Sequence, residues 1–313
     1  METVIAILSL VVGFVFLVKG ADWFVDGAAG IAARFGIPQL IIGLTIVAMG
    51  TSAPEAAVSI SAALKGSADI TIGNIVGSNI LNVLIILGLS AVITPLAVAK
   101  STVKIEIPFM IGVTVLLLVQ GFSQSLGWLD GIVLWVAFIA YLTYLFIYAK
   151  KNPEQAEESE QDKKPRKVWQ LLLLTVIGLA LIIAGSNFAV DGATAIARIL
   201  GLSERFIGLT IVALGTSLPE LFTSVSAARK GNVDIAIGNI VGSNIFNILF
   251  VVGTSALVLP VPFAQGFVFD TATAIFASVL LLICCLRNSK LNRFGGVLML
   301  ACYAAYFAYI SIR

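Results

Sequence analysis

The 313-residue chain contains no histidine and only three cysteines. Histidine is the commonest ligand of transition metals and the usual proton relay near neutral pH, so its absence disfavours both kinds of site. The cysteines, Cys284, Cys285 and Cys302, lie in apolar runs without metal-binding spacing. We expect them to be small side chains in the core or facing lipid.

Charge is the second scarce property. Charged residues make up 12% of the chain and the net charge is +2, whereas hydrophobic residues make up 59%. The near-zero net charge and the lack of a basic stripe argue against a nucleic-acid partner. The apolar residues fall in runs long enough to cross a bilayer, which predicts a polytopic protein of the cell membrane.

Ten apolar segments are predicted to be membrane spans. They lie at about 4–25, 39–64, 70–93, 105–121 and 128–149, and at about 168–190, 205–228, 235–258, 267–286 and 294–311. The polar stretch between the two groups contains Pro153 and Pro165 and is expected to be an exposed linker. The prediction is an all-α membrane protein of ten transmembrane helices, with five-helix repeats at 1–149 and 168–313 joined by a linker at 150–167.

The two halves are copies of each other at a constant offset of 165 residues, as from Glu55 to Glu220 and from Asn82 to Asn247. About two-thirds of positions 43–91 are identical to their partners. Each half has an odd number of predicted spans, so the second half enters the membrane from the opposite side. This predicts inverted repeats, related by a pseudo-two-fold axis in the membrane plane.

Lysine and arginine are unevenly distributed between the loops. The loops after odd-numbered spans and the 150–167 linker carry most of them, and the opposite loops carry few. Because cytoplasmic loops are enriched in basic residues, we expect the linker in the cytoplasm and both termini outside.

Four charged residues near the ends of the first and sixth expected spans are less informative. Asp26 and Asp191 stand beside glycines where we expect these spans to end, and helix capping or a role in an entry vestibule are equally open for them. Lys19 and Asp22 either pair with each other or extend to the membrane surface.

Each half carries the same polar motif inside an apolar span, Gly-Thr-Ser-Ala-Pro-Glu at 50–55 and Gly-Thr-Ser-Leu-Pro-Glu at 215–220. Positions 48, 51, 52 and 55 have helical spacing and share one face. Pro54 lacks an N–H and its ring conflicts with the carbonyl of Gly50, so the helix should kink or open and free backbone carbonyls. Non-helical backbone in mid-membrane is tolerated only in a cavity lined by protein or water, so this face is expected to point inward.

The third and eighth expected spans add amides and hydroxyls at every fourth position, namely Asn74, Ser78 and Asn82, and Asn239, Ser243 and Asn247. The donor atoms are all oxygens, which suits a hard cation such as calcium, with six to eight oxygen ligands. A glutamate at the membrane centre costs at least about 2.5–3.5 kcal/mol on insertion scales. Two such carboxylates would also repel each other unless a cation lay between them.

Structural explanations compete with this one for some of the residues. The small residues of the Gly-Asn-Ile-Val-Gly motifs at 73–77 and 238–242 can serve close helix packing. For the serines and threonines alone, interhelical hydrogen bonding is the simpler interpretation. For Glu55 and Glu220, buried beside prolines and duplicated, we favour a functional role.

The paired motifs at 50–55 and 215–220, each followed by Gly-Asn-Ile-Val-Gly-Ser-Asn, resemble the two α-repeats of the cation/calcium exchanger superfamily. The resemblance covers essentially the whole chain and is strongest to prokaryotic sodium/calcium exchangers of ten spans. It implies sodium-driven calcium transport by alternating access, with the first and sixth spans sliding across an ion-holding core. It implies no enzyme activity and no cofactor; Ca²⁺ and Na⁺ are transported, and a monomer suffices.

The resemblance also implies a set of ion ligands. They are Glu55 and Glu220, the side chains of Thr51, Ser52, Ser78, Asn82, Thr216, Ser217, Ser243 and Asn247, and the carbonyls of Ala48 and Ala213. Potassium-dependent relatives carry aspartate at the position of Asn247, which weakens the case for potassium co-transport here. We expect a sodium/calcium antiporter that exports calcium. A potassium-dependent or proton-coupled exchanger of the same fold is the alternative, and a passive cation channel is less favoured.

Overall fold

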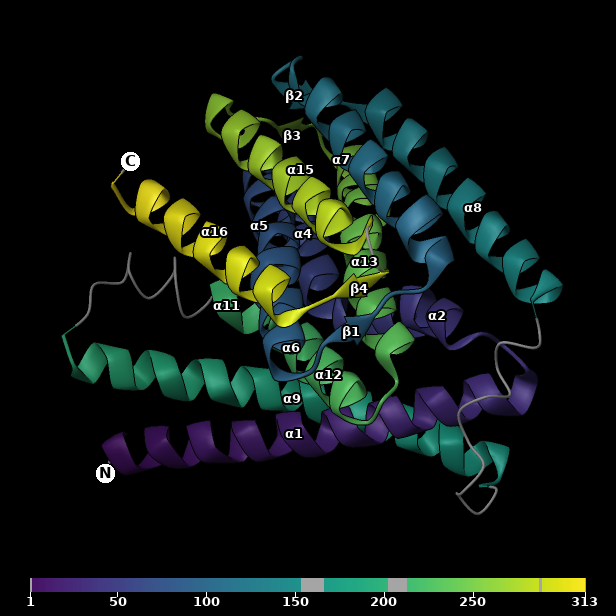
Figure 1. Ribbon diagram of the computed structural model, residues 1–313. Helices are drawn as coiled ribbons and strands as arrows, with labels where there is room; N and C mark the ends of the chain where they lie inside the picture. The colour runs from purple at the N-terminus through teal and green to yellow at the C-terminus, as the bar shows by residue number, and fades with distance from the viewer. Residues whose placement is uncertain (1, 153–165, 202–212, 287–288, 313) are drawn as a thin grey trace.

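Helices form nearly all of the regular structure in the computed structural model, which describes residues 2–152, 166–201, 213–286 and 289–312 (Figure 1). The elements of the first half are α1 (Glu2–Phe35), α2 (Gln39–Ile42), the π-helical turn η1 (Gly43–Val47), α3 (Ala48–Thr51), α4 (Ala53–Leu64), α5 (Asp69–Leu81), the π-helical turn η2 (Asn82–Leu87), α6 (Gly88–Ile93), β1 (Leu96–Ala97), the π-helical turn η3 (Thr102–Glu106), α7 (Ile107–Gly121), β2 (Ser125–Leu126) and α8 (Trp128–Lys151). Those of the second half are α9 (Val168–Ile199), α11 (Ala213–Thr216), α12 (Leu218–Arg229), α13 (Val233–Phe246), the π-helical turn η6 (Asn247–Val252), α14 (Gly253–Val258), β3 (Val261–Pro262), α15 (Gln265–Leu286), β4 (Lys290–Leu291) and α16 (Arg293–Ile312).

The expectation of an all-helical membrane protein is confirmed. Within the described residues, eight helices are long and apolar enough to cross a membrane, and the bent pair 39–51 and 53–64 brings the number to nine. The remaining expected span, at 205–228, begins among residues 202–212, which lie outside the described ranges, and ends in α12. Most of the expected linker, 153–165, also lies outside them.

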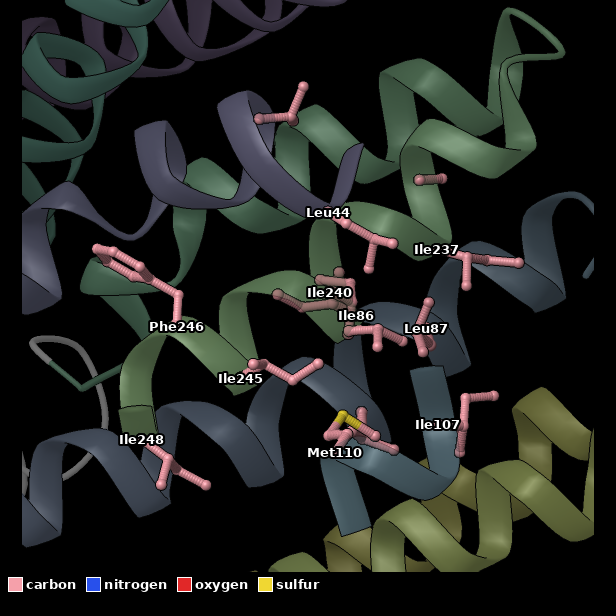
Figure 2. Packing of buried hydrophobic residues seen from close by; sticks show 14 of the residues in the cluster. Leu44, Ile86, Leu87, Ile107, Met110, Ile237, Ile240, Ile245, Phe246 and Ile248 are labelled. Atoms are coloured by element: carbon pink, nitrogen blue, oxygen red, sulfur yellow. The ribbon is translucent and has the colours of Figure 1, made fainter. Parts of the chain in front are cut away.

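The spans differ in how much of each is covered by other helices. The most hydrophobic part of 233–258 is 94% buried and that of 70–93 is 78% buried, whereas that of α16 is only 17% buried. Figure 2 shows the apolar packing around these central helices, with Ile240 of α13 and Leu87 of η2 among the buried side chains. The two spans with the amide and hydroxyl rows therefore form the centre of the bundle.

Small residues on α13 allow residues 40–48 to approach it closely. A Cβ atom at Gly242 would lie 2.6 Å from the carbonyl oxygen of Leu44, and one at Gly238 would lie 2.9 Å from that of Leu40. The close-packing role predicted for the glycines at 238 and 242 is thus confirmed. This contact brings the backbone at Ala48 against the centre of α13.

Helices α1 and α9 lie side by side along one edge of the molecule (Figure 1). A Cβ atom at Gly20 would lie 2.8 Å from the carbonyl oxygen of Gly178, and one at Gly185 would lie 2.8 Å from that of Gly13. Since higher numbers in α1 meet lower numbers in α9, the two helices run antiparallel. This close approach of two backbones is possible only without side chains at these positions.

Both helices are longer than the sequence predicted. The expected ends near Asp26 and Asp191 are wrong, because α1 continues to Phe35 and α9 to Ile199. Packing of one helix on the other stabilises these extensions beyond the most apolar residues. Asp26 and Asp191 therefore lie within helices and cap neither.

Contacts between the two halves come in pairs that obey the 165-residue offset. Leu96 of β1 pairs with Leu291 of β4, and Leu126 of β2 pairs with Val261 of β3, both antiparallel. Leu96 and Val261 are separated by 165 residues, and so are Leu126 and Leu291, so the offset converts one strand pair into the other. The turns η2 and η6 obey the same offset. The duplicated sequence therefore produces duplicated local structure.

Candidate ion-binding site

The helix that carries the first polar motif breaks where proline predicts. α3 ends at Thr51, Ser52 adopts φ −81° and ψ 8°, and α4 begins at Ala53, with a bend of 50° between the two segments. Pro54 cannot donate to the carbonyl of Gly50, so one rung of the helical hydrogen-bond ladder is missing. Ser217, with φ −90° and ψ 3°, makes the same break between α11 and α12. The predicted kink is confirmed in the first half, and the second half has the matching break in its helix.

The two glutamates are buried beside each other at these breaks. Glu55 is 1% exposed and Glu220 is 0% exposed, and their carboxylates repel each other electrostatically. Ser52 Oγ of the first half donates to Glu220 Oε1 of the second half at 2.8 Å. Thr216 is the last residue of α11, next to the break at Ser217. The two polar motifs therefore meet in one buried cluster.

Hydroxyls and amides of the central helices surround the carboxylates. Thr51 Oγ1 donates to Asn239 Oδ1 at 2.9 Å. Asn239 Nδ2 in turn donates to Ser224 Oγ at 2.9 Å and to the carbonyl of Glu220 at 3.4 Å. In the first half Asn74 Nδ2 makes the matching bonds to Ser59 Oγ and to the carbonyl of Glu55. These asparagines fix the helix turn on which each glutamate stands.

The remaining predicted residues lie on the same central helices. Ser243 Oγ donates to the carbonyl of Ala48 at 3.3 Å, which joins a predicted hydroxyl to a predicted carbonyl across the two halves. Ser78 is buried on α5, one turn before Asn82. Ala213 is the first residue of α11.

Several buried oxygens of the cluster accept no hydrogen bond within the described residues. They are both carboxylate oxygens of Glu55, Oε2 of Glu220, the amide oxygens of Asn82 and Asn247, and the hydroxyl of Ser217. Buried polar atoms without partners are rare and costly, so such a group requires an explanation. A hard cation supplies one, because it binds carboxylate, amide and hydroxyl oxygens together. No three His, Cys, Asp or Glu side chains converge in the described part of the chain, so neutral oxygens would complete the coordination of such an ion.

Asn79 and Asn244 belong to this centre, and the sequence prediction left them out. Asn79 Nδ2 donates to the carbonyl of Asn244 at 3.1 Å, and Asn244 Nδ2 donates to the carbonyl of Asn79 at 3.2 Å. Their amide oxygens accept from Asn247 Nδ2 at 3.1 Å and Asn82 Nδ2 at 2.9 Å. The amide nitrogens of Asn82 and Asn247 are thereby occupied, and only their oxygens remain available. The signal was present in the sequence, since both asparagines are duplicated polar residues in apolar spans.

Comparison with known proteins identifies the family. The chain matches the family described as sodium/calcium exchanger protein over residues 5–147 and 170–312. The chain belongs to the sodium/calcium exchanger family. Its members are transporters of Na⁺ and Ca²⁺ and not enzymes.

Individual proteins resemble the chain along nearly its whole length. It is 34% identical over 337 residues to the sodium/calcium exchanger MaX1 of Methanosarcina acetivorans, covering 96% of each protein. It is 38% identical over 318 residues to the inner membrane protein YrbG of Escherichia coli (strain K12), covering 97% of this chain and 96% of that one. A structure of the sodium-calcium exchanger NCX_Mj, soaked with Na⁺ and Sr²⁺, matches with a TM-score of 0.85 at 35% identity and covers 98% of both chains.

The chain contains a further buried carboxylate that the sequence prediction did not single out. Glu106, in η3, is 0% exposed, and its Oε1 accepts a hydrogen bond of 2.7 Å from Tyr144 Oη of α8. Position 271, its partner at the 165-residue offset, is a threonine. Glu106 therefore lacks the duplication that marks Glu55 and Glu220, and it lies on helices other than those that carry the central cluster.

Proposed function

We propose that the protein is a sodium/calcium antiporter that exports calcium from the cytoplasm in exchange for sodium. The observation that carries the proposal is the buried pair Glu55 and Glu220 with their unpartnered oxygens. Family membership makes Na⁺ and Ca²⁺ the ions for such a site. The name of MaX1 and the description of NCX_Mj as exchangers agree with it.

The proposed ligands are the residues implied by the motifs. The carboxylates of Glu55 and Glu220 supply the charge, and the amide oxygens of Asn82 and Asn247 have no other partner within the described residues. The other proposed ligands are Thr51, Ser52, Ser78, Thr216, Ser217 and Ser243 through side chains, and Ala48 and Ala213 through carbonyls. Two carboxylates balance one Ca²⁺ or two Na⁺, so the two ions compete for overlapping oxygens and exchange needs no chemical step.

The proposed architecture is ten spans in two inverted five-helix repeats, 1–149 and 168–313, joined by the linker 150–167. The offset pairs of strands and the antiparallel packing of α1 on α9 support this arrangement. The basic residues of the loops support a cytoplasmic linker with both termini outside. A single chain would be sufficient for transport, because the proposed ligands all come from one copy.

The proposal is tested with purified protein in liposomes. Calcium uptake is followed under an imposed sodium gradient, with potassium and pH varied separately. We expect uptake that depends on the sodium gradient and is unchanged when potassium is removed at constant pH. Equal uptake without sodium would refute antiport with sodium. Strict dependence on potassium or on a pH gradient would instead support the other exchanger types of the same fold.

A further inference from the structure

An ion-pair network ties α1 to α12 near the end of α12. Lys230 Nζ lies 2.8 Å from Asp26 Oδ1 and 3.5 Å from Asp22 Oδ1, and it donates to the carbonyl of Asp22 at 2.7 Å. Ser226 Oγ donates to Asp22 Oδ1 at 2.6 Å. Arg166, at the start of the chain segment that leads into α9, lies 4.0 Å from Asp26 Oδ2. Pairing with Lys19 is one of two alternatives that the sequence leaves open for Asp22, and Asp22 is instead bound to Lys230 and Ser226.

The chain holds a second copy of most of these residues in the other half. At the 165-residue offset, Lys65 corresponds to Lys230, Ser61 to Ser226 and Asp191 to Asp26. Only Asp22 lacks a charged counterpart, because the uncharged Asn187 stands at the corresponding position. The second set would link α9 to α4, as the first links α1 to α12.

That second network is not formed among the residues that the structure describes. Ser226 is 9% exposed under α1, whereas Ser61, Lys65, Asn187 and Asp191 are all exposed. The Lys65 ammonium has no hydrogen bond or ion pair within the described residues, and α9 makes no packing contact with α4 comparable to that of α1 with α12. Of two nearly identical sets of residues, one therefore forms contacts between its two helices and the other does not.

The two sets lie at opposite ends of the central helices. α13 runs parallel to residues 40–48, because Gly238 meets Leu40 and Gly242 meets Leu44. Lys230 lies just before the start of α13 and is therefore level with the start of residues 40–48. Lys65 follows the far end of the same bent span, beyond α4. A contact that alternated between the two sets would close one face of the bundle and open the other.

The centre of the bundle carries the same asymmetry. Ser52 donates to Glu220, whereas Ser217 and Glu55, their partners at the offset, have hydroxyl and carboxylate oxygens without hydrogen bonds within the described residues. The Ser52–Glu220 hydrogen bond and the Lys230–Asp26 ion pair therefore occur together in one conformation. In a chain with duplicated residues, exchanging the roles of the halves gives a second conformation of related energy.

We propose that Lys230, with Asp22 and Asp26, is a positioning residue of the transport cycle, which holds α1 on α12 in this conformation and gives way to a Lys65–Asp191 pair on the opposite face. This inference rests on the proposed alternating-access exchange. Because Asn187 replaces one of the two carboxylates, the Lys65 pair is the weaker one. The sequence difference therefore biases the ion-free transporter toward the conformation with the Lys230 pair.

The test measures the distance between α9 and α4 by pulsed electron resonance in lipid nanodiscs. Spin labels are placed at Leu64→Cys and Ile199→Cys, both at exposed positions, after the three native cysteines are replaced by serine. We expect Lys230→Gln to raise the ratio of the short-distance to the long-distance population by about fivefold. That factor is the upper end of the effect expected from the loss of a partly exposed ion pair. Lys65→Gln is the matched control and should leave this ratio unchanged or lower it, and Lys230→Arg should preserve it.

An unchanged ratio in Lys230→Gln would overturn the proposal, as would equal shifts in the same direction for both glutamine variants. A second variant pair guards against a general effect of charge removal. Asp26→Lys with Lys230→Asp restores an ion pair and should return the ratio toward that of the parent protein. The distances are measured without ion gradients, so a failure of sodium-driven uptake would refute the antiport proposal separately.

Discussion

Replacing Glu55 by glutamine should have opposite effects on the ion-free and the calcium-loaded protein. The substitution keeps the shape of the side chain and one acceptor oxygen but removes a formal charge. Both oxygens of Glu55 are buried next to the carboxylate of Glu220, and neither has a hydrogen-bond partner within the described residues. A neutral amide is less costly to bury there than a carboxylate. With calcium bound, the same change removes one of the two charges that balance the ion.

The magnitudes follow from the burial of the site. Relief of one unpartnered buried group stabilises the ion-free protein by about 1–3 kcal/mol. Removing one partner of a buried ion pair costs about 3–5 kcal/mol, which lowers calcium affinity by a factor on the order of a thousand. The parent protein gains about 2.7 kcal/mol of stability when calcium is at a hundred times its dissociation constant. The variant should gain almost nothing at the same concentration.

Thermal unfolding in detergent, with and without calcium, measures both effects in one experiment. Glu106→Gln is the matched control, because Glu106 is equally buried but hydrogen-bonded to Tyr144, away from the central cluster. The control should keep the calcium-dependent rise in unfolding temperature. If Glu55→Gln kept that rise as well, or unfolded more readily without ions, the assignment of Glu55 as an ion ligand would be refuted.

Two further substitutions test the geometry of the centre. Ser52→Ala removes the donor to Glu220 Oε1 and should destabilise the ion-free protein by about 1–3 kcal/mol. Ser217→Ala removes a hydroxyl without a partner in the described residues and should change stability by less than about 0.5 kcal/mol. Equal effects of the two substitutions in unfolding measurements would contradict the difference between the two serines. Gly242→Ala places a Cβ atom 2.6 Å from the Leu44 carbonyl oxygen and 2.8 Å from Ala48 Cβ, and should cost about 1–3 kcal/mol and weaken calcium binding. Gly112→Ala is the control, because no atom of the described residues lies within 4 Å of the new Cβ. It should be neutral or slightly stabilising, and a comparable loss there would discount the packing argument.

The features predicted correctly from sequence are those set by local chemistry. Proline fixes the break after Thr51 and Ser217, because a missing N–H acts within one turn of helix. Helical spacing places Asn74 on the face of α5 from which it reaches Ser59, since that spacing needs no knowledge of distant residues. The paired strands obey the offset of 165 residues as a consequence of duplication, but the sequence did not predict them, because strands this short have no sequence signal of their own.

What the sequence could not predict depends on distant partners. The extension of α1 past Asp26 requires the glycine contacts with α9, which lies more than a hundred residues away along the chain. Duplication marks Asn79 and Asn244 as unusual in the sequence, but that each donates to the backbone carbonyl of the other is seen only in the structure.

The difference between the two halves is the feature least accessible from sequence, and it bears most directly on mechanism. Ser61 and Ser226 are the same residue in the same duplicated motif, so no local rule assigns one to an exposed position and the other to a buried one. The choice is made by which of two competing sets of contacts the pair α1 and α9 forms with the core. A duplicated sequence encodes both sets, whereas a single structure contains only one of them. The departures from duplication, such as Asp22 opposite Asn187, are therefore the positions where the sequence can favour one conformation over the other.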